Sequence, residues 1–412
     1  MKHTLKQAPS SWLVILILFF ITSAIESMTM SHVFAFMPIY LISLHVAHTK
    51  TWVGILSAVT FVVGLPFVPL WGIWAKRYGG KPVIIRSAYV EMFVFILLSF
   101  SHSLLGIFVA MMLVGFQLGN TGIMLAALRH AAPENKVGFA VSIFSVASSV
   151  GSAGGPLLGG LLVGTHWLNL HGLYLIDGVL SFLAGTMLLL GYREDRIVIP
   201  SLTNENTTSV WHEAWQSITF TFSLSITWIL FGLFSTMMVA RQMVSPYLPL
   251  MIAQLSFFHL PTSSLIGDLM GLSAVVGAII TIYAGRLGDR VGFIRIMTIT
   301  FFILIPSVVL LGITHQILLF TLALTVFSAG YSIVSAMIFA LFSTKIPISH
   351  RSTAMNLIYL PLYIGGIIGP AIASFLVSFS ITLPFVAASI SFLIALLLIA
   401  TQRSRLQQAN GS

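Results

Sequence analysis

Apolar runs of about twenty residues recur along the whole chain, and few charged side chains interrupt them. Only 7% of the 412 residues are charged and 58% are hydrophobic, whereas an ordinary soluble domain has about 25% charged residues. A soluble fold of this size has too little interior to bury so much apolar surface. Because lipid offers no hydrogen-bond partners, each run must satisfy its own backbone groups. The runs therefore predict a membrane protein built from transmembrane helices.

The runs predict twelve spans in two groups of six. The first group lies near residues 11–44, 52–75, 83–102, 104–128, 138–164 and 173–192, and the second near residues 216–251, 265–286, 295–313, 316–343, 353–379 and 382–401. The first run is too long for a signal peptide, so we expect it to be retained as a helix. Polar residues between the groups predict an N-terminal bundle (1–192), a cytoplasmic linker (193–215) and a C-terminal bundle (216–412). The expected fold is an all-α membrane protein with two six-helix bundles.

The positive charge of the chain is concentrated on one side of the predicted membrane. The net charge is +9, which could suggest a nucleic-acid partner. However, 17 of the 19 basic residues fall in or beside the expected cytoplasmic segments, and only Lys50 and Arg241 do not. This asymmetry follows the positive-inside rule. We therefore expect both termini in the cytoplasm and no nucleic-acid partner.

The chain has no cysteine, which excludes a disulfide framework, a thiolate metal site and a catalytic thiol. The sequence also shows no phosphate-binding glycine loop, no metal-ligand spacing and no nucleophile constellation. We therefore expect neither an enzyme nor an ATP-driven pump, and we expect no cofactor and no metal.

Two motifs repeat between the predicted halves at nearly the same offset, which indicates an internal duplication. A loop motif follows the second and the eighth span, with an offset of 213 residues; it comprises Gly72, Lys76, Arg77 and Gly79, and then Gly285, Asp289, Arg290 and Gly292. A glycine motif in the fifth span returns in the eleventh as Gly365, Gly369 and Pro370; its first copy is Gly151, Gly155, Pro156, Gly159 and Gly160. Glycine at every fourth position allows close contact between helices.

On these motifs the chain resembles the major facilitator superfamily over nearly its whole length. Within that superfamily it is most similar to the twelve-helix drug:proton antiporters of the multidrug efflux group, whose helix-5 glycine motif is complete here. The resemblance implies parallel repeats with a substrate site between them. Two departures concern the coupling route: Lys76 replaces the loop-motif acid, and the fourth span keeps Gln117 and Gly119 but has no arginine near Met111–Val114.

Two charged residues inside the predicted spans are the sharpest site candidates. Glu26 lies near the middle of the first span, where a carboxylate is costly unless it is solvated or paired. It could carry protons, receive a cationic substrate or pair with a neighbouring helix. Aligning Pro38 with Pro249 places Arg241 one turn, about 6 Å, outward of Glu26. Arg241 could face Glu26 across a cavity or extend to the outer interface.

Four further polar residues are weaker candidates for proton coupling or substrate binding: Glu91, Gln117, Asn120 and His32. Glu91 could handle protons or make a structural hydrogen bond. Gln117 and Asn120 could line a cavity or join helices, and the sequence does not decide between the two. His32 lies about 240° around the helix from Glu26, so we expect it on a different face, most simply as a packing residue.

Taken together, these features predict an inner (plasma) membrane transporter of a bacterium that exports small lipophilic molecules by proton antiport. Its partners would be a small-molecule substrate, protons and membrane lipids, and we expect it to be a monomer. One alternative is a transporter of a specific metabolite such as a siderophore. A second is a sensor or scaffold that keeps the transporter fold without cycling.

Overall fold

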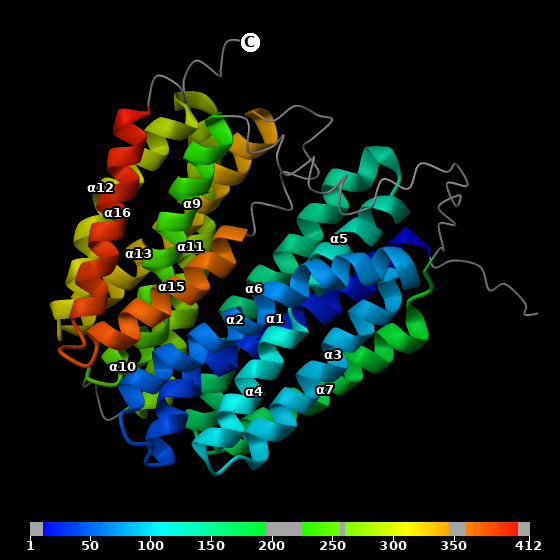
Figure 1. Ribbon diagram of the computed structural model, residues 1–412, viewed down its shortest axis with the longest axis horizontal. Helices are drawn as coiled ribbons and strands as arrows, with labels where there is room; N and C mark the ends of the chain where they lie inside the picture. The colour runs from blue at the N-terminus through cyan, green and yellow to red at the C-terminus, as the bar shows by residue number, and fades with distance from the viewer. Residues whose placement is uncertain (1–10, 195–224, 256–259, 346–359, 403–412) are drawn as a thin grey trace, which may run out of the picture. The chain divides into compact units, whose positions relative to one another are not determined.

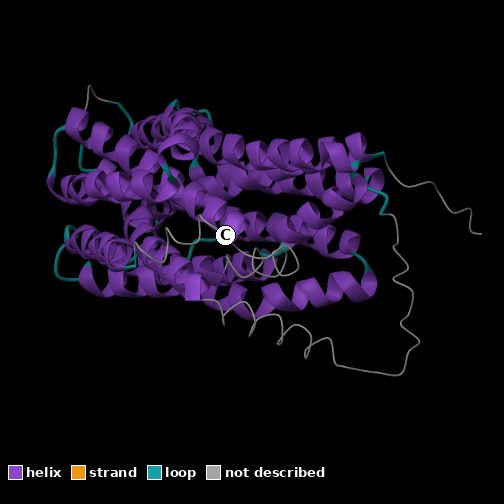
Figure 2. Cartoon of the chain, turned by 90° about the horizontal axis from the view of Figure 1, so that it is seen from above, coloured by secondary structure: helices purple, strands orange, loops and turns teal. Residues whose placement is uncertain are grey.

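The computed structural model describes residues 11–194, 225–255, 260–345 and 360–402. Within these ranges the chain is helical and contains no strand (Figure 2). Among the described residues eleven helical segments are long and apolar enough to cross a membrane, and Leu360–Leu376 is a shorter apolar helix. This confirms the expected all-α membrane fold with twelve helical spans.

The first six spans are formed by seven α-helices and a short 3₁₀ turn. Their bounds are α1 Trp12–Ser43, α2 Thr49–Tyr78, α3 Gly80–Phe100, α4 Leu104–Gln117, α5 Asn120–Ala131, η1 Glu134–Lys136, α6 Val137–Gly164 and α7 Leu170–Gly191. The remaining described elements are α9 Ser225–Val244, η2 Ser245–Tyr247, α10 Leu248–Ile252, α11 Thr262–Val291, α12 Phe293–Ile313, α13 Ile317–Lys345, α15 Leu360–Leu376 and α16 Leu383–Thr401.

The chain divides into two compact units. Unit 1 contains residues 1–33 and 62–205, and unit 2 contains residues 34–61 and 206–412. Residues 34–61, the facing ends of α1 and α2 with the turn between them, thus cluster with unit 2. Most of the expected linker 193–215 lies outside the described residues. The boundaries of the two predicted bundles and of this linker stay predictions.

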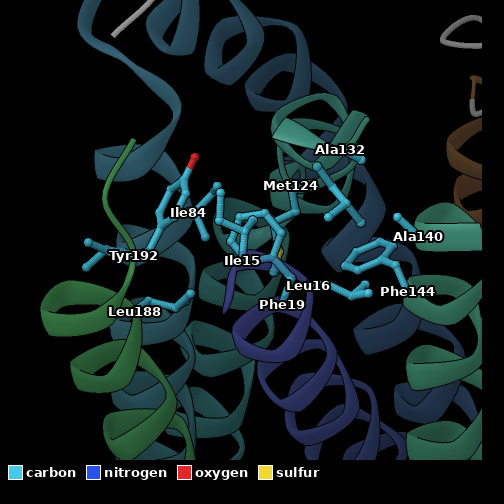
Figure 3. Packing of buried hydrophobic residues seen from close by; sticks show 12 residues of the cluster. Ile15, Leu16, Phe19, Ile84, Met124, Ala132, Ala140, Phe144, Leu188 and Tyr192 are labelled. Carbon is cyan, nitrogen blue, oxygen red and sulfur yellow. The ribbon is translucent and has the colours of Figure 1, made fainter. Parts of the chain in front are cut away.

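Unit 1 has an apolar core at the start of α1. Figure 3 shows Ile15, Leu16 and Phe19 gathered with buried side chains of α3, α5, α6 and α7. Helix α3 packs along α7, and the two run side by side in Figure 1. Small residues permit this contact, because a Cβ atom on Gly185 would lie 3.3 Å from the Cβ atom of Ala88. The core holds together the helices that carry the polar site described below.

The fourth span is interrupted, although the sequence suggested a continuous segment over 104–128. Helix α4 ends at Gln117 and α5 begins at Asn120. Between them Gly119 has φ 105°, a backbone conformation that glycine adopts without steric cost. The break leaves carbonyl groups at the end of α4 without their usual helical donors. They become available to a side chain from another helix.

The glycine motif forms the same close helix seam in each unit. In unit 1, a Cβ atom on Gly151 would lie 2.9 Å from the Cβ atom of Ser27 on α1. In unit 2, a Cβ atom on Gly365 would lie 2.5 Å from the Cβ atom of Met238 on α9. Ser27 and Met238 are 211 residues apart, the offset that the prolines predicted. The internal repeat is therefore visible in the packing as well as in the sequence.

The loop motif also adopts one geometry twice, since Gly79 has φ 97° and Gly292 has φ 95°. In unit 1 the Glu194 carboxylate caps the start of α3, accepting bonds from the backbone N–H groups of Gly80 (2.6 Å) and Lys81 (3.0 Å). A carboxylate at a helix N-terminus is stabilised by unpaired N–H groups and by the helix dipole. Glu194 thus brings an acid to this loop, whereas the side chain of Lys76 lies outside the described part of the chain.

Candidate functional site

A ladder of three polar residues runs along α1. We call Glu26, Thr29 and His32 the α1 ladder. Each is three residues after the one before, so each step rises about 4.5 Å and turns about 300° around the helix. The side chains therefore spread over neighbouring sectors of α1 and contact different helices. Glu26 and His32 thus lie on different sectors of α1 and bond to different neighbouring helices.

The first member of the ladder, Glu26, is held by the broken fourth span. Gln117 Nε2 donates to Glu26 Oε1 at 2.6 Å, and Asn120 Nδ2 donates to both carboxylate oxygens at 3.0 and 2.8 Å. Gln117 ends α4 and Asn120 begins α5, and both side chains are buried. Two amide groups on either side of the break at Gly119 thus donate to one carboxylate.

Arg86 supplies a positive charge to this part of unit 1. Its Nη1 and Nη2 atoms donate to the carbonyl oxygens of Phe116 and Gln117, each at 3.0 Å. Its guanidinium lies over the Trp71 ring, 3.5 Å from the centroid. The Arg86 charge also interacts favourably with the Glu26 carboxylate. Sequence reasoning grouped Arg86 with the cytoplasmic basic residues, although its position inside the third predicted span was a signal that it could act elsewhere.

The second member of the ladder contacts the acid of α3. Thr29 Oγ1 lies 2.7 Å from Glu91 Oε1 and 2.9 Å from the carbonyl oxygen of Ile25. A hydroxyl group has a single hydrogen, so it cannot donate to both oxygens at once. If Thr29 donates to Ile25, Glu91 must supply the hydrogen of the other bond. The Glu91 side chain is only 2% exposed. When Glu91 is protonated, Thr29 can donate to Ile25 and accept from Glu91, so both contacts are hydrogen bonds.

A small cavity lies between the two glutamates. Its polar lining residues are Thr22, Glu26, Glu91 and Asn120, and its apolar lining residues are Ile84, Ala88, Met124, Ala184 and Leu188. The cavity has a volume of about 10 Å³, close to the space that one water molecule requires. Ile84, Met124 and Leu188 also belong to the core of Figure 3. The two carboxyl groups therefore share one water-sized space whose remaining wall is mostly apolar.

The third member of the ladder connects two more helices. His32 Nδ1 lies 2.9 Å from each oxygen of Asp177 on α7, and His32 Nε2 lies 2.9 Å from the carbonyl oxygen of Gly155 on α6. His32 is 3% exposed and Asp177 is 1% exposed. Sequence reasoning missed Asp177. The rule that singled out Glu26, an acid in the middle of an apolar span, would have found it.

In unit 2 the corresponding positions are apolar. With the offset of 211 residues, the α1 ladder corresponds to Met237, Ala240 and Met243 of α9, all of which are buried. Arg241 is half-buried; its Nη1 donates to Tyr331 Oη at 3.0 Å and its guanidinium lies 4.0 Å from the centroid of that ring. Because Glu26 and Arg241 belong to different units, the expected approach between them stays a prediction.

The chain matches a family model described as "Major Facilitator Superfamily" over residues 19–267 and 237–411. It is 26% identical over 355 residues to the multi-drug resistance efflux pump PmrA of Streptococcus pneumoniae, covering 84% of this chain and 85% of PmrA. It is 28% identical over 316 residues to the multidrug resistance protein MdtG of Proteus mirabilis, covering 73% of this chain and 75% of MdtG.

Solved structures with the same fold include a bacterial homologue of the human lysosomal transporter Spinster, in an inward-facing, unoccupied conformation. Its TM-score is 0.75 at 13% identity, with 97% of this chain and 96% of that chain covered. An auto-inhibited peptide transporter of the POT family gives a TM-score of 0.74 at 15% identity, with 94% and 96% covered. At these identities the likeness concerns the fold alone.

Proposed function

Because the chain belongs to the Major Facilitator Superfamily and is an integral membrane transporter rather than an enzyme, we propose that it exports small lipophilic molecules in exchange for protons. The names of PmrA and MdtG as multidrug proteins support the substrate class. The complete helix-5 glycine motif supports the direction of transport. We further propose that it resides in a bacterial inner membrane with both termini in the cytoplasm.

The observation that carries proton coupling is the pair of acids around one water-sized cavity. Two ionised carboxylates in a low-dielectric site repel each other strongly. The site is therefore expected to hold at least one proton in the arrangement described. An intramembrane acid of this kind marks a functional site by default.

The hydrogen bonds favour different forms of the two acids. Glu26 receives amide donors from Gln117 and Asn120, and such donors suit a carboxylate. Glu91 faces a single hydroxyl group, which can accept a hydrogen from a protonated carboxyl group. A proton would rest on Glu91 while Arg86 offsets the charge of Glu26. One water in the cavity would let that proton pass between the two groups.

The glycine seam gives this proton site a route to conformational change. Gly151 and Gly155 hold α6 against the same stretch of α1 that carries Glu26. A change in the charge of Glu26 or Glu91 would alter the contacts of α1 with α3, α4 and α5. A shift of α1 would then be transmitted to α6 through direct contact. Alternating access needs such a two-state element that proton binding can bias.

The test is transport in proteoliposomes with an imposed pH gradient, using ethidium as the transported dye and lumenal pyranine as the proton probe. The Glu26→Gln variant should lose gradient-driven dye movement while it keeps its thermal stability, because the amide cannot exchange a proton. The control is Glu194→Gln, which changes an acid outside the spans and should remain coupled. Coupled transport by a folded Glu26→Gln protein would overturn this proposal, and so would a wild-type chain that moves no dye under any gradient.

A further inference from the structure

The His32–Asp177 pair is not used by the proton route through Glu26 and Glu91, yet it joins three helices at the glycine seam. The imidazole of α1 bonds to the carboxyl group of α7 on one side and to the Gly155 carbonyl of α6 on the other. A Cβ atom on Gly155 would overlap Ser31 Oγ, the side chain next to His32 in sequence. The imidazole thus lies beside a close contact between α1 and α6.

The number of protons held by His32 and Asp177 follows from which atoms around His32 donate and which accept hydrogen bonds. A backbone carbonyl oxygen only accepts, so the bond to Gly155 requires a hydrogen on His32 Nε2. The bond at Nδ1 then has two forms: an imidazolium facing the Asp177 carboxylate, or a neutral imidazole accepting from protonated Asp177. Both forms contain the same number of protons, and both are neutral overall.

Removal of that one proton breaks the arrangement. With the hydrogen kept on Nε2, the lone pair of Nδ1 would face two carboxylate oxygens at 2.9 Å with no hydrogen between them. If the hydrogen moved to Nδ1 instead, the Gly155 carbonyl would lose its donor and the imidazole would present a second acceptor to it. In neither case do both contacts of His32 persist, so the link between the three helices depends on the proton.

From these relations we propose that His32 and Asp177 form a second proton-binding site, which clamps α1 to α6 at Gly155 when occupied and releases the glycine seam when empty. The proposal rests on the proposed function only for its role in transport. Proton binding by the pair and its effect on α6 stand on the geometry of unit 1.

The charged groups around the pair make it sensitive to the first proton site. Glu91 of α3 lies close enough to interact with Asp177, and Glu26 follows on α1. Helix α6 has no titratable residue, and the other titratable residues of α7 are His171 and Tyr174. Because an empty His32–Asp177 pair is negatively charged, its proton and the proton of Glu91 are not lost independently. Release at one site would affect the other.

The first test is ¹⁵N NMR of histidine-labelled protein in nanodiscs, with the His32 signals assigned by their absence in His32→Gln. As the pH is raised, the nitrogen signals of wild-type His32 should change when the pair loses its proton. The Asp177→Asn variant has nearly the same shape but cannot share that proton, so its His32 signals should follow a different pH dependence. An identical transition in wild type and Asp177→Asn would overturn the proposal.

The second test is hydrogen exchange of the α6 backbone around Gly155. After division by the intrinsic amide exchange rate at each pH, exchange should rise by about tenfold or more when the proton is lost, since a hydrogen bond to a charged group is removed. His32→Gln keeps an amide donor for Gly155 but cannot titrate, so its corrected exchange should not vary with pH around this transition. A pH-dependent change of equal size in His32→Gln would contradict the clamp. Both tests follow the His32–Asp177 pair directly and do not measure transport, so the pH-dependent change at His32 and its effect on α6 should persist in Glu26→Gln.

Discussion

The two units share one packing scaffold but differ in what they place on it. In unit 1 the glycines of α6 pack against α1, and in unit 2 the glycines of α15 pack against α9. Helix α1 also carries the α1 ladder, whereas the equivalent residues of α9 are methionine and alanine. The two units therefore share the close helix contact made by the glycines, but they do not share the polar side chains.

The same contrast holds for the third helix of each unit. Helices α3 and α12 both contain 21 residues, and the offset of 213 pairs Glu91 with Leu304. Both side chains are buried. The two acids that follow the linker in sequence, Asp268 and Asp289, are exposed in unit 2. Buried acids are therefore a property of unit 1 among the described residues, which supports the proposal that proton handling belongs to that unit.

The largest effect is expected where the units are alike. Gly155→Leu and Gly369→Leu should each reduce dye transport by at least about 100-fold, because a side chain at either position overlaps the facing helix. The control is Gly154→Leu, since a Cβ atom on Gly154 meets no other atom within 4 Å. Transport rates in proteoliposomes test this. Normal transport by either seam variant would show that its seam does not need close contact.

The next effect is expected where the units differ. Glu91→Leu makes α3 resemble α12, and should abolish gradient-driven transport without lowering the melting temperature, because an apolar side chain replaces a buried carboxyl group. The reverse change, Leu304→Glu, should destabilise unit 2 by about 2 kcal/mol or more, since it buries an acid without partners. Thermal unfolding and pyranine-monitored transport distinguish these outcomes. Coupled transport by Glu91→Leu would remove Glu91 from the proton route.

A smaller effect is expected at Arg86. Arg86→Lys keeps the charge, but it loses the paired donation to the carbonyl groups of Phe116 and Gln117 and the planar contact with Trp71. We expect a loss of about tenfold in coupled transport with little change in dye binding, because the broken span no longer holds its amides toward Glu26. Dye binding by fluorescence and transport are measured together. If Arg86→Lys equals wild type in both, the guanidinium does not position the site.

The smallest effect is expected at the cap of α3. Glu194→Gln weakens the acceptor that binds the backbone of Gly80 and Lys81, and should lower the stability by about 1 kcal/mol or less. Coupling should be unchanged, since Glu194 lies outside the proton site. Burial and, to a smaller extent, the charge of Glu194 raise the pKa of the Tyr192 hydroxyl, so the variant should lower that pKa. A loss of coupling in Glu194→Gln would mean that proton handling extends to the loop.

The sequence predicted the helical fold and the internal repeat well because both depend on local signals. Apolar runs of span length predict helices, and the offset of 211 recovers the pairing of Ser27 and Met238 against equivalent glycines. The fourth span was harder, since the apolar pattern predicted neither the break at Gly119 nor the contact of Gln117 and Asn120 with Glu26. Whether a glycine inside an apolar span bends it depends on tertiary contacts.

The partners within the site could not be read from single spans. Glu26 stands out in the sequence as an intramembrane acid, and Asp177 satisfies the same rule, but neither residue reveals its partner. The bond between His32 and Asp177 joins residues 145 positions apart, and no periodicity predicts such a contact. Arg86 was grouped by its charge with cytoplasmic residues, although its guanidinium bonds to carbonyl groups of α4. Hydrophobic pattern sets depth and topology, while the direction of a polar side chain depends on the neighbours that the fold brings to it.

The central claim, that unit 1 handles the proton, is tested most directly by counting protons released when substrate binds. Purified protein in weakly buffered detergent solution is mixed with ethidium while a pH indicator is followed. The wild type should release about one proton per bound dye molecule, since a bound cation replaces a proton in a site that cannot hold two like charges. Glu26→Gln and Glu91→Gln should release none, and Arg241→Gln should release as many as wild type for each bound dye. Release that persists in both glutamate variants and disappears in Arg241→Gln would contradict the account.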